Sequence, residues 1–313
     1  MEEDPSESIF PGNTSVLPRR DALADAYRRR QKELQNEISE FFGLYCRNTD
    51  NNFKSAFFSQ ICPYTNRPCT KMRKSNPQTK IGTCTVRFQG QEVILCPTRL
   101  LEDKLIFQDC VSLLKKPEPD DQVFLVPEVK IPGGHVDYFL VSVKGEEIKD
   151  FLGIELQTMD TIGTVWPARQ MFLSKQGISI KEEELQSKKT FAINWKMTMK
   201  TILLQMHHKS GTFESLGKHY VLVLQQTLID HIKKEFNYDG LKQSDSQNYI
   251  HIHSYDLSEK ENHFKLFLRS KESTNSAGIA KCLDMNKMPD VTLPSMVSRL
   301  CQKMKGKTQL PLF

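Results

Sequence analysis

Two strand-like segments joined by a polar turn place the strongest constraint on the fold of this chain. Val136–Val143 and Phe151–Thr158 are mostly apolar, and Gly145-Glu146-Glu147-Ile148 lies between them, which predicts an antiparallel hairpin. Downstream, apolar patterns predict a helix over Phe191–His208, a strand over His219–Gln225, a helix over Thr227–Phe236, and strands over Tyr249–Tyr255 and Phe264–Leu268. Because strands and helices interleave without repeats, we expect an α/β or mixed α+β architecture.

Length and composition narrow the possibilities further. The chain has 313 residues, 38% of them hydrophobic, which is enough to bury a core and exceeds the usual size of one domain. The formal charge of +5 is small, so binding to a polyanion would depend on local basic patches. The start, Met1-Glu2-Glu3-Asp4-Pro5, is acidic, and no apolar run reaches the length of a transmembrane helix. We therefore expect the cytoplasm, where cysteines are rarely disulfides.

The N-terminal region is expected to be a polar arm followed by a helix. Residues 1–18 contain three prolines. A helix is predicted from Asp21 as N-cap, with apolar residues at helical spacing: Leu23, Tyr27, Leu34, Ile38 and Phe41. The run Arg28-Arg29-Arg30 is typical of a solvated face, with phosphate contact as the alternative.

Four of the eight cysteines, Cys62, Cys69, Cys84 and Cys96, are clustered in the first third of the chain. A hairpin centred on Gly90 would place Cys84 opposite Cys96. Prolines follow Cys62 and Cys96 and stiffen the chain there. In a reducing compartment, such a cluster predicts a closed tetrahedral site for zinc or iron.

The alternative for this cluster is four ordinary buried cysteines. Free cysteine is among the most buried residue types, and the spacing lacks the closely spaced cysteine pairs of many metal modules. Cys46 could replace one ligand. Three further cysteines have no partner at ligand spacing and are expected to be structural: Cys110, Cys282 and Cys301.

A second group of polar residues lies on the predicted hairpin itself. An antiparallel pairing centred on the turn sets Asp137 opposite roughly position 156. Glu155 and Gln157 are two residues apart and therefore point to one face of the sheet, whereas Leu156 points to the other. Two carboxylates close together repel each other, and a divalent cation would remove that repulsion.

This arrangement predicts a metal-dependent phosphodiesterase site, in which Asp137, Glu155 and the Leu156 carbonyl hold Mg²⁺. Such a metal activates a water molecule and stabilises charge that develops on the phosphate. Gln157 occupies the position where sites of this kind usually carry lysine; its amide can orient the attacking water but supplies no positive charge. Glu128 is a candidate acid for a second metal or for supporting the first, and a plain surface glutamate is the alternative.

Longer stretches of the sequence resemble one known family. Four segments resemble the cysteine-bound metal module of the NotI-type restriction endonucleases: Cys62-Pro63, Cys69-Thr70-Lys71, Gly82-Thr83-Cys84-Thr85-Val86 and Leu95-Cys96-Pro97-Thr98-Arg99. Residues 153–160, continuing through Gly163 to Pro167-Ala168, are similar to the catalytic strand of that family and the turn after it. Glu40-Phe41-Phe42-Gly43 and Lys189-Thr190-Phe191 are also similar. The resemblance covers about residues 40–205 and the ending Leu310-Pro311-Leu312-Phe313.

The resemblance implies a PD-(D/E)xK restriction-endonuclease-like mixed sheet flanked by helices, with a small N-terminal cysteine-bound metal module. We expect an arm and helix in residues 1–60, the four-cysteine module in 61–98 and the nuclease domain in 99–313. The resemblance further implies that Gln157 takes the lysine position and that the four cysteines hold iron, which shapes DNA-binding loops. It implies a type II endonuclease of the bacterial cytoplasm, with a cognate DNA methyltransferase. Such enzymes act as Mg²⁺-dependent homodimers on G·C-rich palindromes and leave 5′ extensions.

Base recognition in such a protein would use arginine or lysine side chains in the major groove. Five residues are candidates, with phosphate contacts or plain solvated side chains as alternatives: Lys71, Arg73, Lys74, Arg99 and Arg169. A different hypothesis is a non-catalytic DNA-binding regulator whose functional part is the cysteine module. It predicts site-specific binding without Mg²⁺-dependent cleavage.

Histidines suggest a further, weaker alternative. His251 and His253 alternate on a predicted strand, and His263 lies downstream, so a histidine metal site is conceivable. Histidines two apart on a half-exposed strand usually form its polar face, which is the expectation here. His207-His208 is expected near a helix end, where the helix dipole favours it.

Overall fold

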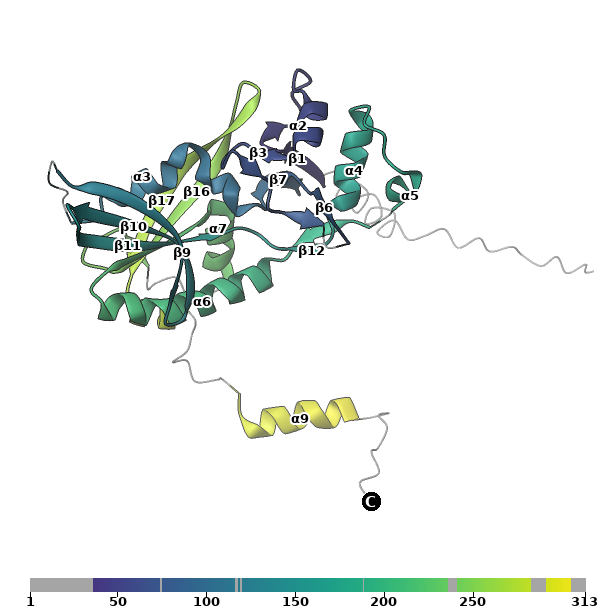
Figure 1. Cartoon of the computed structure of the whole chain (residues 1–313). Coiled ribbons are helices and arrows are strands. Elements are labelled where there is room, and N and C mark those ends of the chain that lie inside the picture. Colours follow the sequence, from purple (N-terminus) through teal and green to yellow (C-terminus); the bar gives the residue numbers. More distant parts are fainter. Residues whose placement is uncertain are drawn as a thin grey trace, which may run out of the picture. The chain divides into compact units, whose positions relative to one another are not determined.

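The computed structural model describes residues 36–73, 75–115, 118, 120–187, 189–235, 241–282 and 291–304 (Figure 1). Within these ranges the chain is a mixed α/β protein with a seven-stranded mixed sheet and eight α-helices. The chain divides into two compact units. One comprises the described residues up to Leu105 with Thr158–Thr198 and Leu257–Phe267; the other comprises Ile106–Gln157, Met199–Asp256 and the described residues from Leu268 onward.

The first unit is built mainly from short strands. They are β1 (Glu37–Phe41), β2 (Leu44–Tyr45), β3 (Ile61–Cys62), β4 (Arg67–Pro68), β5 (Met72–Arg73), β6 (Asn76–Lys80), β7 (Thr83–Phe88), β8 (Gln91–Ile94), β12 (Thr161–Gly163) and β13 (Phe191–Ile193). Its helices are α2 (Phe53–Ser59), the 3₁₀ segment η1 (Pro97–Lys104), α4 (Trp166–Lys175) and α5 (Glu182–Leu185). A four-stranded sheet has the order β2-β1-β7-β8, and three two-stranded ribbons pair β3 with β4, β5 with β6 and β12 with β13.

The N-terminal helix expected from Asp21 lies largely outside the described residues. For its last part, which includes Ile38 and Phe41, the prediction is wrong. Residues Glu37–Phe41 form strand β1, which pairs antiparallel with β2 and β7. Four consecutive residues of this strand are buried, from Ile38 to Phe41. A strand buried on both faces places Ile38 and Phe41 inside without requiring helical spacing, which explains the misleading pattern.

The second unit contains the larger sheet. Its strands are β9 (Gln122–Ile131), β10 (Gly134–Lys144), β11 (Glu147–Gln157), β14 (His219–Gln225) and β15 (Lys242–Gln243). Its helices are α3 (Leu105–Val111), α7 (Gln226–Glu235), α8 (Ser276–Cys282) and α9 (Leu293–Met304). Four elements have residues in both units: α3, whose first residue Leu105 belongs to the first unit, α6 (Trp195–Ser215), β16 (Ile250–Lys260) and β17 (His263–Thr274).

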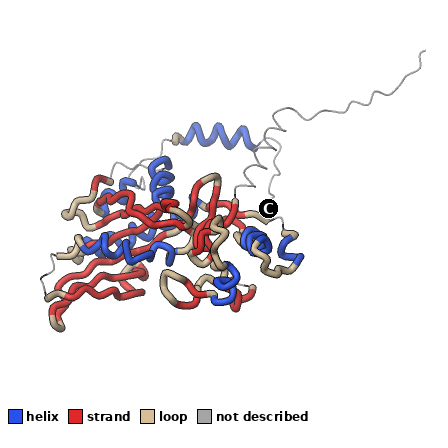
Figure 2. The backbone as a smooth tube through the Cα atoms, turned by 90° about the horizontal axis from the view of Figure 1, so that it is seen from above, coloured by secondary structure: helices blue, strands red, loops and turns tan. Residues whose placement is uncertain are grey.

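The strands of the larger sheet have the order β15-β17-β16-β14-β11-β10-β9. Figure 2 shows the strands of the chain in red and its helices in blue. β9, β10 and β11 are antiparallel neighbours, whereas β14 is parallel to both β11 and β16. The central strand β14 is buried from Tyr220 to Gln225, as is typical of a parallel strand covered on both faces. The expected hairpin, the strand over 219–225 and the helix after it are therefore confirmed.

The helix predicted over Phe191–His208 is wrong at both ends. Phe191–Ile193 pairs with β12 as a strand, and the helix α6 starts at Trp195 and continues to Ser215. His207 and His208 therefore lie in the middle of α6, where a helix-end dipole has no role. None of the helices in the described ranges combines the length and apolar character needed to cross a lipid bilayer.

Candidate functional site

The hairpin of β10 and β11 brings two acidic residues to the same level of the sheet. Tyr138 pairs with Ile154 and Phe139 with Gly153, so one residue further along this register Asp137 is level with Glu155. The sequence predicted roughly position 156 as the partner of Asp137, which differs from the observed partner, Glu155, by one residue. The turn contains only two residues between Lys144 and Glu147, and a register shift follows at Ser142/Val143. Opposite residues of an antiparallel pair share a face, so the Asp137 and Glu155 side chains point the same way.

Asp137 leans toward the neighbouring strand. Its Oδ2 accepts a hydrogen bond from the backbone N–H of Leu156 at 2.8 Å, and the residue is half-buried. Burial raises the pKa of Asp137, while the Leu156 N–H and the charge of Lys209 lower it and the charge of Glu128 raises it. The carboxylate is thus held over β11 by a backbone hydrogen bond that favours its ionised form.

Glu155 is more deeply buried, with 7% of its surface exposed. Its Oε1 forms an ion pair with Lys209 Nζ at 2.7 Å. Its Oε2 is also buried, and no residue in the described ranges gives it a hydrogen bond. Burial raises the pKa of Glu155, the hydrogen bond from Lys209 lowers it, and the nearby Asp137 raises it again. A buried carboxylate oxygen without a donor requires a further partner.

Glu128 completes a row of three acidic residues on adjacent strands. β9 pairs with β10 through Val129 with Val136 and Pro127 with Tyr138, which sets Glu128 level with Asp137. Glu128 is exposed and has a φ of +52°, a left-handed conformation that is uncommon for a residue other than glycine. The structure therefore brings Glu128 beside Asp137, where its charge acts on the pKa of that carboxyl group.

Gln157 ends β11 two residues after Glu155, and it is half-buried. It pairs with Leu224 on β14, and Glu155 pairs with Leu222. Successive strand residues point to opposite faces, so Gln157 and Glu155 share one face and Leu156 faces the other. This part of the sequence-based site is as expected.

A further residue of the site, which the sequence pattern did not indicate, is Lys209; it lies on α6 and is 2% exposed. Its Nζ donates to the carbonyl oxygen of His135 at 2.5 Å as well as contacting Glu155. The available signal was the helical period: Lys209 is three residues after buried Met206 and four before buried Phe213, so it belongs to the apolar stripe. The helix predicted from the sequence ends at His208, one residue before Lys209, so the predicted apolar stripe does not include this charged residue.

Two glycines let α6 pack closely on the strands of the site. A Cβ atom on Gly153 would lie 2.4 Å from Cζ of Phe213, so the ring occupies space that any side chain would need. A Cβ on Gly133 would lie 2.9 Å from the carbonyl oxygen of His208. The Phe213 ring packs against Phe139 and Tyr220, with centroids 6.0 and 5.0 Å away. These contacts place Lys209, one turn before Phe213, over Glu155.

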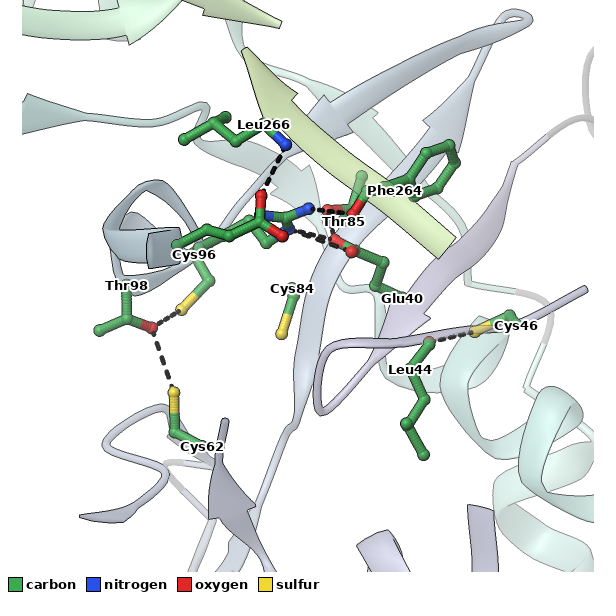
Figure 3. A network of polar contacts seen from close by, with 12 residues as sticks. Glu40, Leu44, Cys46, Cys62, Cys84, Thr85, Cys96, Thr98, Phe264 and Leu266 are labelled. Carbon is green, nitrogen blue, oxygen red and sulfur yellow. Dashed lines mark hydrogen bonds and ion pairs between the residues drawn. The ribbon is translucent and has the colours of Figure 1, made fainter. Parts of the chain in front are cut away.

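The four clustered cysteines form a second candidate site in the first unit. Cys62 is on β3, Cys69 follows β4, Cys84 is on β7 and Cys96 follows β8, and all four are buried. The charges of Cys62 and Cys96 both act on the pKa of Cys69 and of Cys84, which burial raises most. Thr98 Oγ1 lies 3.0 Å from Cys96 Sγ and 3.7 Å from Cys62 Sγ (Figure 3). The four thiols are therefore neighbours.

The register of the cysteine hairpin differs from the expected one. Thr85 pairs with Ile94 and Phe88 with Gln91, so the turn consists of Gln89 and Gly90, both with positive φ. Positive φ at both central residues is the hairpin geometry that matches strand twist. Cys84 consequently faces position 95, and its carbonyl accepts the N–H of Cys96 at 3.2 Å.

The other cysteines have different surroundings. The charges that act on Cys46 are those of Glu40, Glu37 and Glu92, and its Sγ approaches the carbonyl of Leu44 (Figure 3). Cys110 and Cys282 are buried, whereas Cys301 is exposed.

Arg99, a candidate for base recognition, is fully buried. Its Nε donates to Glu40 at 2.8 Å, its Nη1 to Glu102 at 3.1 Å and its Nη2 to the Phe264 carbonyl at 3.2 Å (Figure 3). Burial raises the pKa of Glu40, and Arg99 lowers it. This network ties η1 to β1 within the first unit, so Arg99 is wrong as a DNA-reading residue.

The remaining basic candidates also have partners. Arg169 is buried and donates to the carbonyls of Ile81 and Lys80, and burial lowers its pKa to about 10. Burial therefore excludes Arg169 from the candidates for base recognition. Lys71 Nζ donates to a backbone carbonyl at 3.0 Å, and Arg73 pairs with a glutamate at 2.7 Å. Lys74 lies outside the described residues.

His251 and His253 are not on a polar face, contrary to expectation. Both are fully buried on β16. His251 Nε2 lies 3.0 Å from Nδ1 of His219 on β14, and His253 Nδ1 lies 3.7 Å from Cys110 Sγ. His263 is exposed on β17. The three candidates therefore do not form one group.

Across the described residues, no set of three or more His, Cys, Asp or Glu side chains is arranged as a ready-made metal site. The fold thus defines a mixed α/β protein with an acidic row on its larger sheet and a cluster of four thiols in its other unit. Comparisons with models of known protein families and with curated proteins find no match for this chain.

Proposed function

We propose that this protein is a Mg²⁺-dependent site-specific deoxyribonuclease of the type II restriction class. It would act as a homodimer on a G·C-rich palindrome and leave 5′ extensions, beside a cognate DNA methyltransferase in a bacterial cytoplasm. A two-fold dimer matches a two-fold DNA site. The observation that carries the proposal is the convergence of Asp137, Glu155 and Gln157 on one face of the mixed sheet.

The acidic residues fit a divalent cation. Glu155 Oε2 is buried and has no donor among the described residues, and burial raises the pKa of both Glu155 and Asp137. Hard cations such as Mg²⁺ take oxygen ligands. Glu155, Asp137 and the Leu156 carbonyl would hold the ion. The N–H and C=O of one strand residue point to the same side, so the Leu156 carbonyl faces the side of Asp137.

Each group in the site would have a separate role in hydrolysis. When bound, Mg²⁺ supplies the Lewis acidity that activates water and offsets charge on the phosphate. Gln157 orients the attacking water through its amide, which both donates and accepts hydrogen bonds. Glu128 adds a third carboxylate beside Asp137, available to a second cation or as an acceptor for a water proton.

The donor chemistry of four neighbouring cysteines suits a structural metal, and we propose iron, with zinc as the other ion that four thiolates accept. Cys62, Cys69, Cys84 and Cys96 would bind it. The chain around them consists of short two-stranded ribbons, β3 with β4 and β5 with β6, which a metal would hold together. Such a module would shape loops that contact DNA.

The test is digestion of G·C-rich plasmids with and without Mg²⁺, followed by run-off sequencing of the ends. Wild-type protein is expected to produce discrete fragments only with Mg²⁺. Glu155→Gln and Gln157→Ala are expected to lose cleavage but to retain binding to the same DNA in Ca²⁺. Glu146→Gln, which changes an exposed glutamate in the neighbouring turn, is the matched control and should cut normally.

Two outcomes would refute the proposal. Cleavage by Glu155→Gln at the wild-type rate would remove the active-site assignment. Site-specific DNA binding without any Mg²⁺-dependent cleavage would support the alternative, a DNA-binding regulator whose functional part is the cysteine module.

A further inference from the structure

The nuclease site proposed above lacks a cation on its catalytic strand. Gln157 occupies the position two residues after Glu155, and an amide carries no charge. Hydrolysis of a phosphodiester develops negative charge that fixed positive groups stabilise in a site sheltered from water. The described residues around Glu155 contain one buried ammonium group, that of Lys209.

Lys209 is held with little freedom. Its Nζ contacts Glu155 Oε1 at 2.7 Å and the His135 carbonyl at 2.5 Å. The ammonium has three N–H groups, and the described residues provide acceptors for two of them. The third N–H is available to a phosphate oxygen or to the attacking water.

Two contacts within the same unit fix the position of α6, the helix that carries Lys209. Phe213 fills the space above Gly153, two residues before Glu155 on the same face. On the other side, Thr212 Oγ1 donates to the carbonyl of Pro132 at 3.2 Å. A buried lysine costs several kcal/mol of desolvation, which its ion pair with Glu155 and its hydrogen bond to the His135 carbonyl offset in part.

We propose that Lys209, reaching in from α6, supplies the positive charge that the glutamine on the catalytic strand cannot. It orients Glu155 and places an ammonium group beside the reacting phosphate. The charge thus comes from a helix more than fifty positions later in the sequence instead of from the strand itself. This inference rests on the proposed nuclease function.

The experiment compares Lys209→Gln with Lys218→Gln in full-length protein, by steady-state cleavage of G·C-rich plasmid DNA in saturating Mg²⁺. Lys218 pairs with Asp150 at 2.5 Å in the same unit, so its variant also breaks an ion pair with a buried carboxylate. Lys209→Gln is expected to lower kcat about a hundredfold to a thousandfold, with KM for DNA nearly unchanged. Lys218→Gln should leave both constants unchanged.

A second variant separates charge from folding. In Lys209→Gln/Gln157→Lys the positive charge returns to the strand beside Glu155, and we expect at least a tenfold recovery of kcat over Lys209→Gln. If Lys209→Gln does not fold, the double variant is expected to fold and cleave.

The outcomes are distinct. Wild-type protein that cuts no DNA overturns the nuclease function and this inference with it. Cleavage by wild type together with an unchanged kcat for Lys209→Gln overturns only the role of Lys209. If Lys209→Gln folds, a double variant that recovers no activity over it also overturns this role. If Lys209→Gln does not fold, a double variant that cleaves no DNA overturns it as well.

Discussion

The buried histidines of the larger sheet should make the protein sensitive to acid. His251 and His253 are fully buried on β16. The pKa of His251 is lowered to about 4 and that of His253 to about 3, mainly by burial, and the charge of Lys271 contributes to both shifts. The neighbouring His219 also lowers the pKa of His251, while Asp245 raises it. Both residues therefore stay neutral in the fold at pH 5.

The sign and size of the effect follow from proton linkage. In the unfolded chain both histidines return to a pKa of 6.5, so below this pH the unfolded state binds more protons than the folded state. The contribution of the two neutral histidines to the free energy of unfolding is fully present above pH 6.5. It is lost as the pH falls toward the pKa values that the histidines have in the folded state. At about 1.4 kcal/mol per pH unit, each histidine costs about 2 kcal/mol between pH 7 and pH 5, or roughly 4 kcal/mol for the pair.

Urea unfolding followed by circular dichroism at several pH values measures this loss. His253→Gln removes one of the two titrating groups, and we expect its loss of unfolding free energy between pH 7 and pH 5 to be about 2 kcal/mol smaller than that of wild type. His263→Gln alters an exposed histidine on β17 and should behave as wild type does. Equal losses in wild type and His253→Gln would show that this histidine already carries a proton in the folded state.

Three further predictions concern packing and metal binding. Glu40→Leu leaves the Arg99 charge buried without its partner and should lower the free energy of unfolding, measured by chemical denaturation, by about 3–5 kcal/mol. The double variant Glu40→Leu/Arg99→Met should recover most of that loss, and a single variant as stable as wild type would contradict this expectation. Gly153→Ala, whose Cβ would meet the Phe213 ring at 2.4 Å, should destabilise the protein by about 1–3 kcal/mol and reduce cleavage, and Phe213→Leu should relieve the clash. Elemental analysis should find about one iron per chain in wild type and far less in Cys84→Ser, and wild-type protein without bound metal would argue for four ordinary buried thiols.

Much of the acidic site was predictable because it depends on local rules. Alternation along a strand puts Glu155 and Gln157 on one face, and a short polar turn between two apolar runs folds back as a hairpin. The pairing of Asp137 was predicted only to within one residue. The turn contains only Gly145 and Glu146, which is shorter than expected, and a bulge near Lys149 then shifts the register by one residue; no local pattern indicates either feature.

Burial decided what the basic residues do. From the sequence, Arg99 and Arg169 were reasonable candidates for reading bases, because arginine is usually exposed. In the structure both guanidinium groups are enclosed and bound to carboxylates or backbone carbonyls. The partners, such as Glu40 and Phe264, are distant in sequence, so only the folded chain brings them together.

By itself, the sequence determined the interleaved strands and helices, the cluster of four cysteines and the shared face of Glu155 and Gln157, because each follows from spacing along the chain. The tertiary structure alone decided that Lys209 contacts Glu155. That contact depends on α6 packing against the sheet, where the Phe213 ring occupies the space that a side chain at position 153 would need. Such packing joins residues far apart in the sequence, and no local pattern encodes it.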